Sequence, residues 1–458
     1  MRQILFNANI VNEGRQFAGY VIIEGDKIAE VAQGAPTEAV IESCERAEDL
    51  SGAMILPGVI DDQVHFREPG LTHKADIASE SRAAVAGGVT SFMDMPNTIP
   101  QTTDNEILEW KFARAGETSV ANYSFSIGAT NENIELLKGL DYSRICGVKA
   151  FLGSSTGNML VDDKTALEHL FSAIPAIISV HSEDEAIIRA NREWYVSERG
   201  DDLPVEFHPL IRSAEACYES TARAVELASR CGTRLHVFHV STARELTLFS
   251  DQPLEDKRIT AEVCVHHLWF SDRDYARLGN RIKCNPAIKT VADRDALRDA
   301  LLTGRLDVVA TDHAPHLLSE KVGNCLKAAS GMPLVQFSLV AMLEMAREGV
   351  FSTELVVEKM CHAPAKLYRI DRRGFIRPGY YADLAIVREN PAGHTITADD
   401  VLSKCGWSPF EGTTMHYHVE RTYVNGTEAY RAGESGSPEF LRGSITPSPC
   451  GRRLLFNV

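Results

Sequence analysis

Short apolar and β-branched runs recur through the centre of the chain and alternate with segments of helical character. Near-continuous apolar strands are typical of a sheet that is covered by helices on both faces. Residues 76–86 are rich in alanine and are followed by Gly87-Gly88, a helix-ending signal, and residues 213–230 have the 3.6-residue period of an amphipathic helix. The predicted strands begin at Met54, Thr90, Ala121, Ile145, Ala176, Leu235, Ile259 and Leu306.

This alternation of strand and helix predicts a fold of the α/β class. Parallel strands with intervening helices, spread over about 260 residues, favour a (β/α)8 TIM barrel. A doubly wound open sheet is the alternative, but the chain lacks the glycine-rich first turn of such folds. We expect the barrel to occupy residues 54–373.

Both ends of the chain show the alternation of apolar and polar residues that is typical of β-strands. It is clear in residues 1–53 and again in residues 374–430, where Asn425-Gly426 is a β-hairpin signal. We expect one small β-sandwich domain assembled from both termini, residues 1–53 plus 374–458, with the barrel inserted between them.

Charge and composition exclude several classes of function. Lys and Arg number 47 against 63 Asp and Glu, and the net charge of −16 opposes the binding of nucleic acid. No apolar segment approaches the roughly 18 residues of a membrane-spanning helix, and the first residues lack the pattern of a signal peptide, so we expect a cytoplasmic protein that binds no membrane. The 10 Cys include no C-x-x-C pair, which indicates reduced thiols.

Polar residues gather where the predicted strands end, which is where a barrel enzyme has its active site. Gln63, His65 and Arg67 alternate at the end of the first strand and are expected to share a face. Later strands end in or contain Asn97, Lys149, His181, His239 and Asp312, with His316 just beyond. A single histidine at a strand end is usually a packing residue. Three histidines and an aspartate at the same end of four strands supply the ligands that suit Zn²⁺, so the set predicts a metal site.

Lys149 needs a separate explanation, because an ammonium group near a dication would be repelled and desolvated. A neutral lysine can react with carbon dioxide and form a carbamate, which is anionic and can bridge two metal ions. The alternative is a lysine turned outward to a carboxylate. The residues themselves leave both possibilities open.

The motifs match a known family. They are residues 62–70 (DQVHFREPG), residues 95–98 (MPNT), Lys149, residues 180–183 (VHSE), residues 239–242 (HVST), residues 310–316 (ATDHAPH) and the closing residues 453–457 (RLLFN). On these motifs the chain resembles the class I dihydroorotases of the amidohydrolase superfamily over almost its whole length. The resemblance implies a metal-dependent barrel with a terminal β-sandwich, and a homodimer.

The resemblance also implies the roles of the site residues. A carboxylated Lys149 would bridge one zinc ion held by His65 and Asp312 to a second held by His181 and His239, with one or two ions bound. Arg67, Asn97 and His316 would hold the substrate carboxylate, and Asn285 would line the ring. The reaction would be the reversible cyclisation of N-carbamoyl-L-aspartate to L-dihydroorotate in pyrimidine (UMP) biosynthesis, with a metal-activated hydroxide and Asp312 as general base and then acid.

Gln63 departs from the family, which has the first His of a His-x-His pair at this position. A Gln amide oxygen is a weaker and neutral zinc ligand, so the first metal would be held loosely, held through Gln63, or absent. Gln63 could instead hydrogen-bond another ligand or a water. His236 shares no strand face with His239 and is expected to be structural.

Two other functions stay open. An allantoinase or hydantoinase would share the metal ligands, but it would have no use for the acid-binding Arg67 and His316. The lost histidine at Gln63 also permits a catalytically silent barrel that associates with another pyrimidine-pathway enzyme. The retention of Lys149 and Asp312 argues against that reading.

Overall fold

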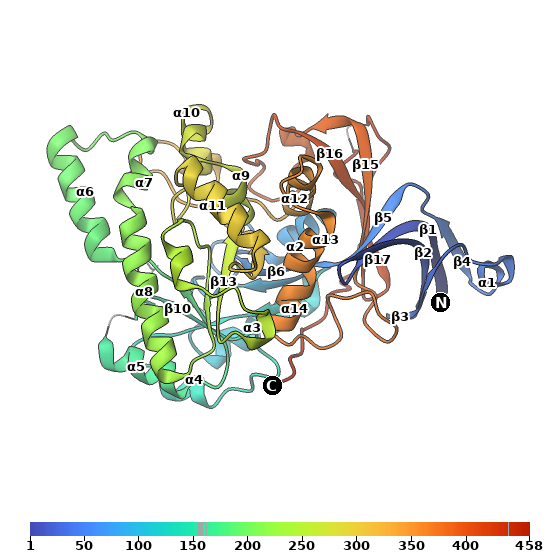
Figure 1. Cartoon of the computed structure of the whole chain (residues 1–458), viewed down its shortest axis with the longest axis horizontal. Coiled ribbons are helices and arrows are strands. Elements are labelled where there is room, and N and C mark those ends of the chain that lie inside the picture. Colours follow the sequence, from blue (N-terminus) through green and yellow to red (C-terminus); the bar gives the residue numbers. More distant parts are fainter. Residues whose placement is uncertain (154–158, 162, 438) are drawn as a thin grey trace.

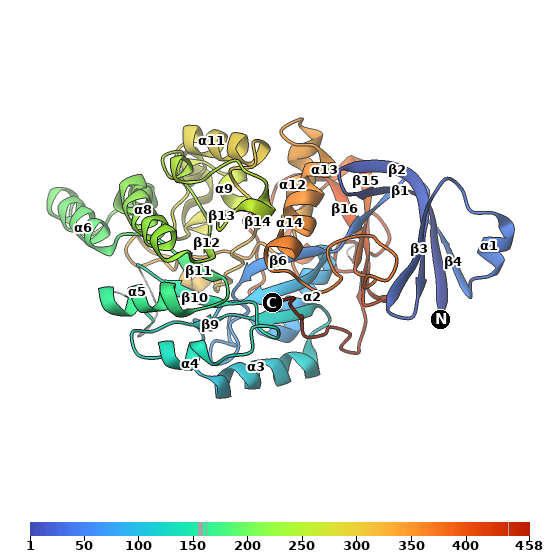
Figure 2. The same cartoon turned by 60° about the horizontal axis from the view of Figure 1, so that its bottom comes forward.

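The computed structural model describes residues 1–153, 159–161, 163–437 and 439–458. The centre of the chain forms an α/β barrel, and strands from both ends form a sheet beside it (Figure 1). A second view shows strands β1 to β3 standing away from the barrel helices (Figure 2).

Two parallel sheets build the barrel. One has the order β6-β7-β8 and the other the order β14-β13-β12-β11-β10-β9. The third predicted run supplies both β8 and β9, and an isolated parallel bridge between Val64 and His313 connects the far ends of the two sheets. The barrel is confirmed, although the hydrogen-bonded sheet is interrupted. Its strands are β6 (Val59–Val64), β7 (Val89–Asp94), β8 (Asn122–Phe125), β9 (Ile127–Gly128), β10 (Val148–Phe151), β11 (Ile178–His181), β12 (Leu235–Val237), β13 (Ile259–Cys264) and β14 (Val308–Ala310).

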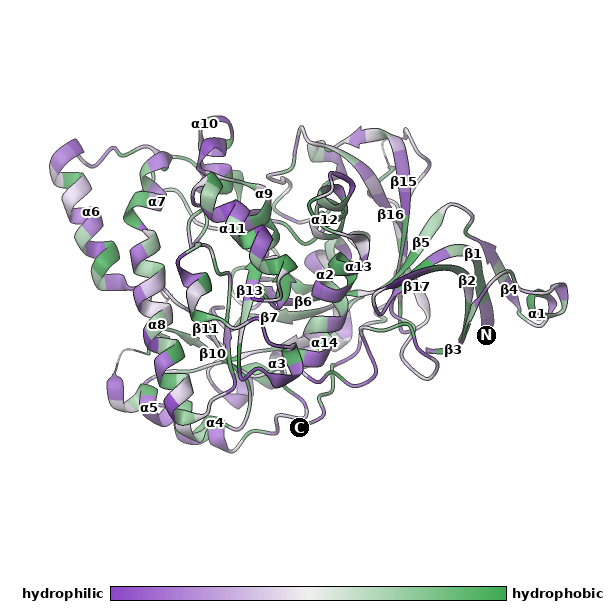
Figure 3. Ribbon diagram, in the orientation of Figure 1, coloured by the Kyte–Doolittle hydropathy of each residue, from purple (hydrophilic) through white to green (hydrophobic). Residues whose placement is uncertain are grey.

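Helices cover the outside of the barrel, and Figure 3 shows apolar residues concentrated where helices and strands meet. Every residue of β6, β7, β10 and β11 is buried, as expected for strands covered on both faces. The helices are α1 (Glu38–Glu42), α2 (Ile77–Ala86), α3 (Asn105–Thr118), α4 (Ile134–Lys138), α5 (Lys164–Ala173), α6 (Glu185–Arg199), α7 (His208–Ile211), α8 (Ala214–Cys231), α9 (Val265–Trp269), α10 (Tyr275–Leu278), α11 (Val291–Leu302), α12 (Ser338–Arg347), α13 (Thr353–Val357) and α14 (Ala363–Leu367).

The two predicted helices are confirmed, with their caps. Asp76 begins α2 by accepting a hydrogen bond from the Ser79 amide, and Ser213 begins α8 by accepting one from the Ala216 amide. Helix α8 ends at Gly232, whose left-handed backbone favours glycine. Among the described residues, no helix combines the length and the apolar composition that crossing a bilayer requires.

The ends of the chain meet in one nine-stranded sheet of order β18-β17-β16-β15-β5-β1-β2-β3, with β4 paired to β1. The predicted hairpin is confirmed, since Asn425 and Gly426 both have positive φ between β16 and β17. A two-layered sandwich is not shown, and the predicted domain boundaries stay a prediction. The strands are β1 (Arg2–Asn12), β2 (Arg15–Glu24), β3 (Lys27–Gln33), β4 (Arg46–Asp49), β5 (Ala53–Pro57), β15 (Leu384–Thr395), β16 (Thr414–Val424), β17 (Thr427–Arg431) and β18 (Ser444–Ile445).

The first predicted run is divided between the two parts. Its beginning, β5, pairs with β1 and β15 in the terminal sheet, whereas β6 belongs to the barrel. The break falls at Gly58, where a Cβ atom would lie 2.1 Å from Thr90 Oγ1. Glycine therefore permits the close contact at which the chain passes from one sheet to the other.

Candidate active site

One cavity of about 430 Å³ contains every residue that the sequence placed in the site. It lies at the C-terminal ends of the barrel strands, as barrel enzymes require. The predicted residues that line it are Gln63, His65, Arg67, Asn97, Lys149, His181, His239, Asn285, Asp312 and His316. The structure thus brings the ten predicted residues together around one cavity.

His65 and Asp312 form the first pair of metal-ligand types. His65 Nδ1 lies 2.8 Å from the Asn97 side-chain oxygen and Nε2 lies 3.0 Å from Asp312 Oδ1. In the tautomer that donates its Nδ1 proton to Asn97, the lone pair of Nε2 points toward the carboxylate. Two acceptors this close fit a shared cation, because two ligands on one tetrahedral zinc ion lie roughly 3.3 Å apart.

His181 and His239 form the second pair, with 3.0 Å between Nδ1 and Nε2. His181 Nε2 lies 3.0 Å from Glu183 Oε2, and Arg212 forms an ion pair with the same carboxylate. Burial would raise the pKa of Glu183, but Arg212 and His181 hold it below its usual range. The anionic Glu183 fixes the proton of His181 on Nε2, so that Nδ1 is free to bind a cation.

His239 is kept neutral. Burial, followed by the nearby charges of His181 and Lys149, lowers the pKa of His239 well below its ordinary value. Neutral imidazole is the form that binds metal ions. Glu262 holds His239 in place by accepting a hydrogen bond of 3.0 Å from its backbone amide.

Lys149 points into the barrel, so it is not turned outward to a carboxylate. It is 1% exposed, and its Nζ has no hydrogen-bond partner among the described residues. Nζ lies 4.0 Å from the centre of the Phe238 ring. Burial lowers the pKa of Lys149 to about 7, so a large fraction of the amine is neutral near neutral pH.

Gln63 is buried and also lines the cavity. Its side-chain oxygen lies 3.9 Å from Cys264 Sγ, which is a weak donor. The amide oxygen is therefore available to a cation or a water molecule.

Arg67 dominates the opposite side of the cavity. It is 8% exposed, and it forms no ion pair with a carboxylate in the part of the chain that the structure describes. Nε donates a hydrogen bond of 3.1 Å to the Pro315 carbonyl, and Nη2 lies 3.2 Å from His316 Nε2. Lys74 Nζ lies 3.2 Å from His316 Nδ1 and forms an ion pair with Glu320.

His316 lies between these two cations. Burial, together with Arg67 and Lys74, lowers its pKa to about 2, so the ring is neutral. A neutral imidazole has one nitrogen lone pair and cannot accept from both cations. Lys74 is already paired with Glu320, so Arg67 is the one of these two cations that has no carboxylate partner among the described residues.

Three of the predicted residues have a left-handed backbone, which non-glycine residues adopt at a cost. The φ angles are 68° for Arg67, 43° for His239 and 46° for Asp312. Strain of this kind is held in place by the surrounding structure and gathers at functional sites.

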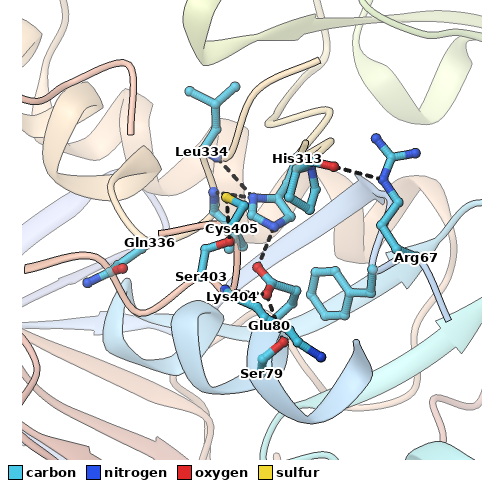
Figure 4. A network of polar contacts seen from close by, with 12 residues as sticks. Arg67, Ser79, Glu80, His313, Leu334, Gln336, Ser403, Lys404 and Cys405 are labelled. Carbon is cyan, nitrogen blue, oxygen red and sulfur yellow. Dashed lines mark hydrogen bonds and ion pairs between the residues drawn. The ribbon is translucent and has the colours of Figure 1, made fainter. Parts of the chain in front are cut away.

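A network that the sequence did not predict surrounds His313, the residue that follows Asp312 (Figure 4). His313 Nδ1 accepts hydrogen bonds from the Leu334 and Val335 amides, so its proton is on Nε2, which lies 2.8 Å from Glu80 Oε2. The His313 carbonyl accepts a hydrogen bond of 2.7 Å from the His65 amide. The two residues that carry the first ligand pair are thereby fixed to each other.

Two compact groups of metal-ligand types lie outside the cavity lining. They are Asp62, His236 and Glu262, and Cys264, His266 and His267. His236 is fully buried, with Nδ1 2.8 Å from Thr260 Oγ1 and Nε2 3.3 Å from Asp62 Oδ2. It does not reach the cavity, in agreement with the structural role predicted for it.

Lys74, Arg212 and Glu80 were not predicted from the sequence. Each lies on a loop or helix whose position depends on the completed fold, so no strand-end pattern marks it. Glu183 stands two residues after His181, and an acid at that spacing was a signal that could have been used.

Residues 54–429 match the Amidohydrolase family. The chain belongs to this family. It is 34% identical over 439 residues to a dihydroorotase of Methanosarcina acetivorans, covering 93% of this chain and 92% of the relative, and 36% identical over 379 residues to a dihydroorotase of Halobacterium salinarum, covering 82% and 86%. It is also 30% identical over 456 residues to an allantoinase of Bacillus velezensis, covering 97% and 98%.

A solved structure shares the whole fold. The L-hydantoinase of Arthrobacter aurescens superposes with a TM-score of 0.90 at 24% identity, covering 99% of each chain. At this identity the likeness supports the α/β barrel fold alone.

Proposed function

We propose that this amidohydrolase is a dihydroorotase, a cyclic amide hydrolase that interconverts N-carbamoyl-L-aspartate and L-dihydroorotate in de novo pyrimidine synthesis. Dihydroorotases are among its relatives at 33 to 36% identity. The contents of the cavity support the same choice.

The observation that carries this proposal is the buried guanidinium of Arg67, which lacks a carboxylate partner among the described residues. A buried cation is costly unless it is paired. Both proposed substrates carry a carboxylate that does not take part in the reaction, and a guanidinium binds a carboxylate through two parallel hydrogen bonds. Asn97 and His316 flank this position and complete the proposed grip.

The donor set fits the metal ions that amidohydrolases generally use. His65 with Asp312, and His181 with His239, present pairs of lone-pair atoms 3.0 Å apart, and the unpartnered Lys149 Nζ lies in the same cavity. We propose that these residues hold one or two zinc ions, with a carbamate on Lys149 and with Gln63 as an additional ligand. When bound, such ions lower the pKa of water and polarise a carbonyl.

The chain's own residues supply the remaining chemistry. Asp312 accepts the proton of the attacking water and returns it to the departing ring nitrogen, a role that is typically worth about 10² to 10⁴ in rate. Arg67 fixes the substrate carboxylate and thereby aims the ring amide at Asp312. His208 Nε2 lies 3.1 Å from the Asn285 side-chain oxygen, so the Asn285 amide N–H groups are left to bind the pyrimidine ring.

An allantoinase is the second candidate, because a relative of that name aligns over 97% of the chain. The ring of allantoin carries no carboxylate, so Arg67 would keep an unpaired charge in the enzyme–substrate complex. A homodimer, and association with another pyrimidine-pathway enzyme, stay predictions from the family resemblance.

A substrate panel tests the proposal. Purified protein supplied with zinc and bicarbonate is expected to hydrolyse L-dihydroorotate, followed by loss of its ultraviolet absorbance, and to close N-carbamoyl-L-aspartate in the reverse direction. Faster turnover of allantoin or hydantoin would contradict the assignment. Failure to turn over any of these rings by folded, zinc-loaded protein would favour a silent barrel.

A further inference from the structure

A second cavity of about 480 Å³ lies at the opposite end of the barrel. It is formed by the residues just before β11 and β12, by the start of β13, by α14 and by the segment that follows α14. The C-terminus also lies near α14 (Figure 2), and Asn457 is part of the lining. The two cavities share no lining residue.

The lining of this cavity is strongly basic in a chain of net charge −16. Among the described residues of the lining, Glu255 is the one acidic side chain. The cations are Arg234, Lys257, Arg258, Lys366, Arg369, Arg373 and Arg377. A concave surface of one sign focuses the electrostatic potential and concentrates ions of the opposite sign.

Four of these cations are neutralised by carboxylates. Lys257 pairs with Asp307, Lys366 with Glu358, Arg373 with Asp383 and Arg377 with Glu13. These four contribute little net charge to the cavity. The field inside it therefore depends on the other three cations.

Arg234, Arg258 and Arg369 have no carboxylate within ion-pair distance in the part of the chain that the structure describes. Arg234 Nη2 donates a hydrogen bond of 2.7 Å to the Leu367 carbonyl, and Arg258 Nη1 donates one of 2.6 Å to the Gly232 carbonyl. Burial, followed by the charges of Arg369 and Arg258, lowers the pKa of Arg234. Arg369 and Arg258 thus each repel Arg234, and no carboxylate within ion-pair distance among the described residues offsets the repulsion.

The backbone conformation of Arg369 adds a second energetic cost to the repulsion between the guanidinium groups. Its φ angle is 54°, in the region that favours glycine, just after the end of α14. Its backbone is held there by hydrogen bonds, since its amide donates to the Lys366 carbonyl and its carbonyl accepts from the Asn457 amide. An arginine at a glycine position and among like charges is expected where its side chain has a ligand.

We propose that this cavity binds an anion that carries a chain of phosphate groups, either free or as part of a nucleotide. Three unpaired guanidinium groups call for more than one negative charge, and guanidinium is the side chain best matched to phosphate oxygens. The volume lies within the roughly 300 to 1,000 Å³ of small-molecule sites. The Phe375 ring already stacks on His362 and contacts the Arg377 guanidinium, so the phosphates rather than a stacked base carry the recognition.

Calorimetric titration of the purified protein, in buffer without added zinc, with sodium tripolyphosphate at low ionic strength tests the site. We expect one tripolyphosphate per chain, with an affinity that falls as salt is added. Arg369→Gly is expected to weaken binding at least about tenfold, the loss typical of one charge-assisted contact. This variant also relieves the backbone, so misfolding does not explain the loss.

Two control variants separate this site from other effects. Arg372→Gly removes an exposed arginine at φ 49° that is three residues away and outside the cavity lining, and it should bind as the wild type does. Arg67→Gln disables the anion side of the catalytic cavity and should also leave the affinity unchanged. Absence of binding, equal affinities of the Arg369→Gly and Arg372→Gly variants, or loss of binding in the Arg67→Gln variant would overturn the proposal.

Titration with ATP and UTP separates the two sources of the ligand. Nucleotides that bind more tightly than tripolyphosphate, with the same loss in the Arg369→Gly variant, would assign the site to nucleotides. Binding of tripolyphosphate alone would assign it to free polyphosphate.

Discussion

His65 Nε2 and Asp312 Oδ1 lie 3.0 Å apart, although 247 residues separate the two in the chain. The parallel bridge between Val64 and His313 joins the first and last strands of the barrel at this point. The contact therefore depends on the barrel being formed. It places a carboxylate beside a histidine ring nitrogen, which is the geometry that the proposed base next to a metal ligand would need.

Asp312→Asn tests the proposed base directly. We expect the turnover number for L-dihydroorotate to fall by about 10² to 10⁴, because an amide cannot accept the proton of water at neutral pH. Asparagine tolerates the left-handed backbone of residue 312, so the fold should be kept. Circular dichroism and the melting temperature check the fold. A variant with close to wild-type turnover would exclude Asp312 as the base.

Arg67→Gln tests whether Arg67 binds the substrate carboxylate. Loss of hydrogen bonds to a charged group typically costs about 1.5 to 3 kcal/mol, so kcat/KM for L-dihydroorotate should fall roughly 10- to 150-fold. Arg82→Gln, which removes an exposed arginine on α2, is the matched control and should have no effect. Equal kinetics for the two variants would show that Arg67 does not bind the substrate.

The pKa of Lys149 predicts how the rate of carbamate formation depends on pH. Only the neutral amine reacts with carbon dioxide, and the pKa of Lys149 is lowered to about 7. Reactivation of carbon dioxide-free protein by zinc at a fixed concentration of dissolved carbon dioxide should therefore accelerate about tenfold per pH unit below pH 7 and level off above it. Lys149→Arg, which stays charged, should not be reactivated. Full activity of carbon dioxide-free protein would rule out the carbamate.

Gln63→His tests whether residue 63 is a zinc ligand. An imidazole binds zinc more strongly than a neutral amide oxygen, so the dissociation constant for zinc should fall at least about tenfold. Equilibrium dialysis with zinc measures it, and the wild-type protein is the reference. An unchanged constant would mean that residue 63 does not face the metal.

The barrel and the cavity residues were predictable because their signals are local. Apolar runs marked the strands, and the barrel rule then placed residues such as His181 and His239 at one end. Strand alternation at the termini did not specify pairing partners, so the single nine-stranded sheet was not foreseen. Lys74 and the Arg212–Glu183 ion pair come from loops and helices that only the finished fold brings to the site.

The proposed function depends on recognition of the substrate carboxylate, and a comparison of two substrates tests this recognition most directly. The kcat/KM of zinc- and bicarbonate-supplied protein should be measured for L-dihydroorotate and for 5,6-dihydrouracil, which has the same ring without the carboxylate. We predict that L-dihydroorotate is preferred by about 10-fold or more, the typical contribution of a hydrogen-bonded charge. Equal or better turnover of 5,6-dihydrouracil would contradict the proposed function.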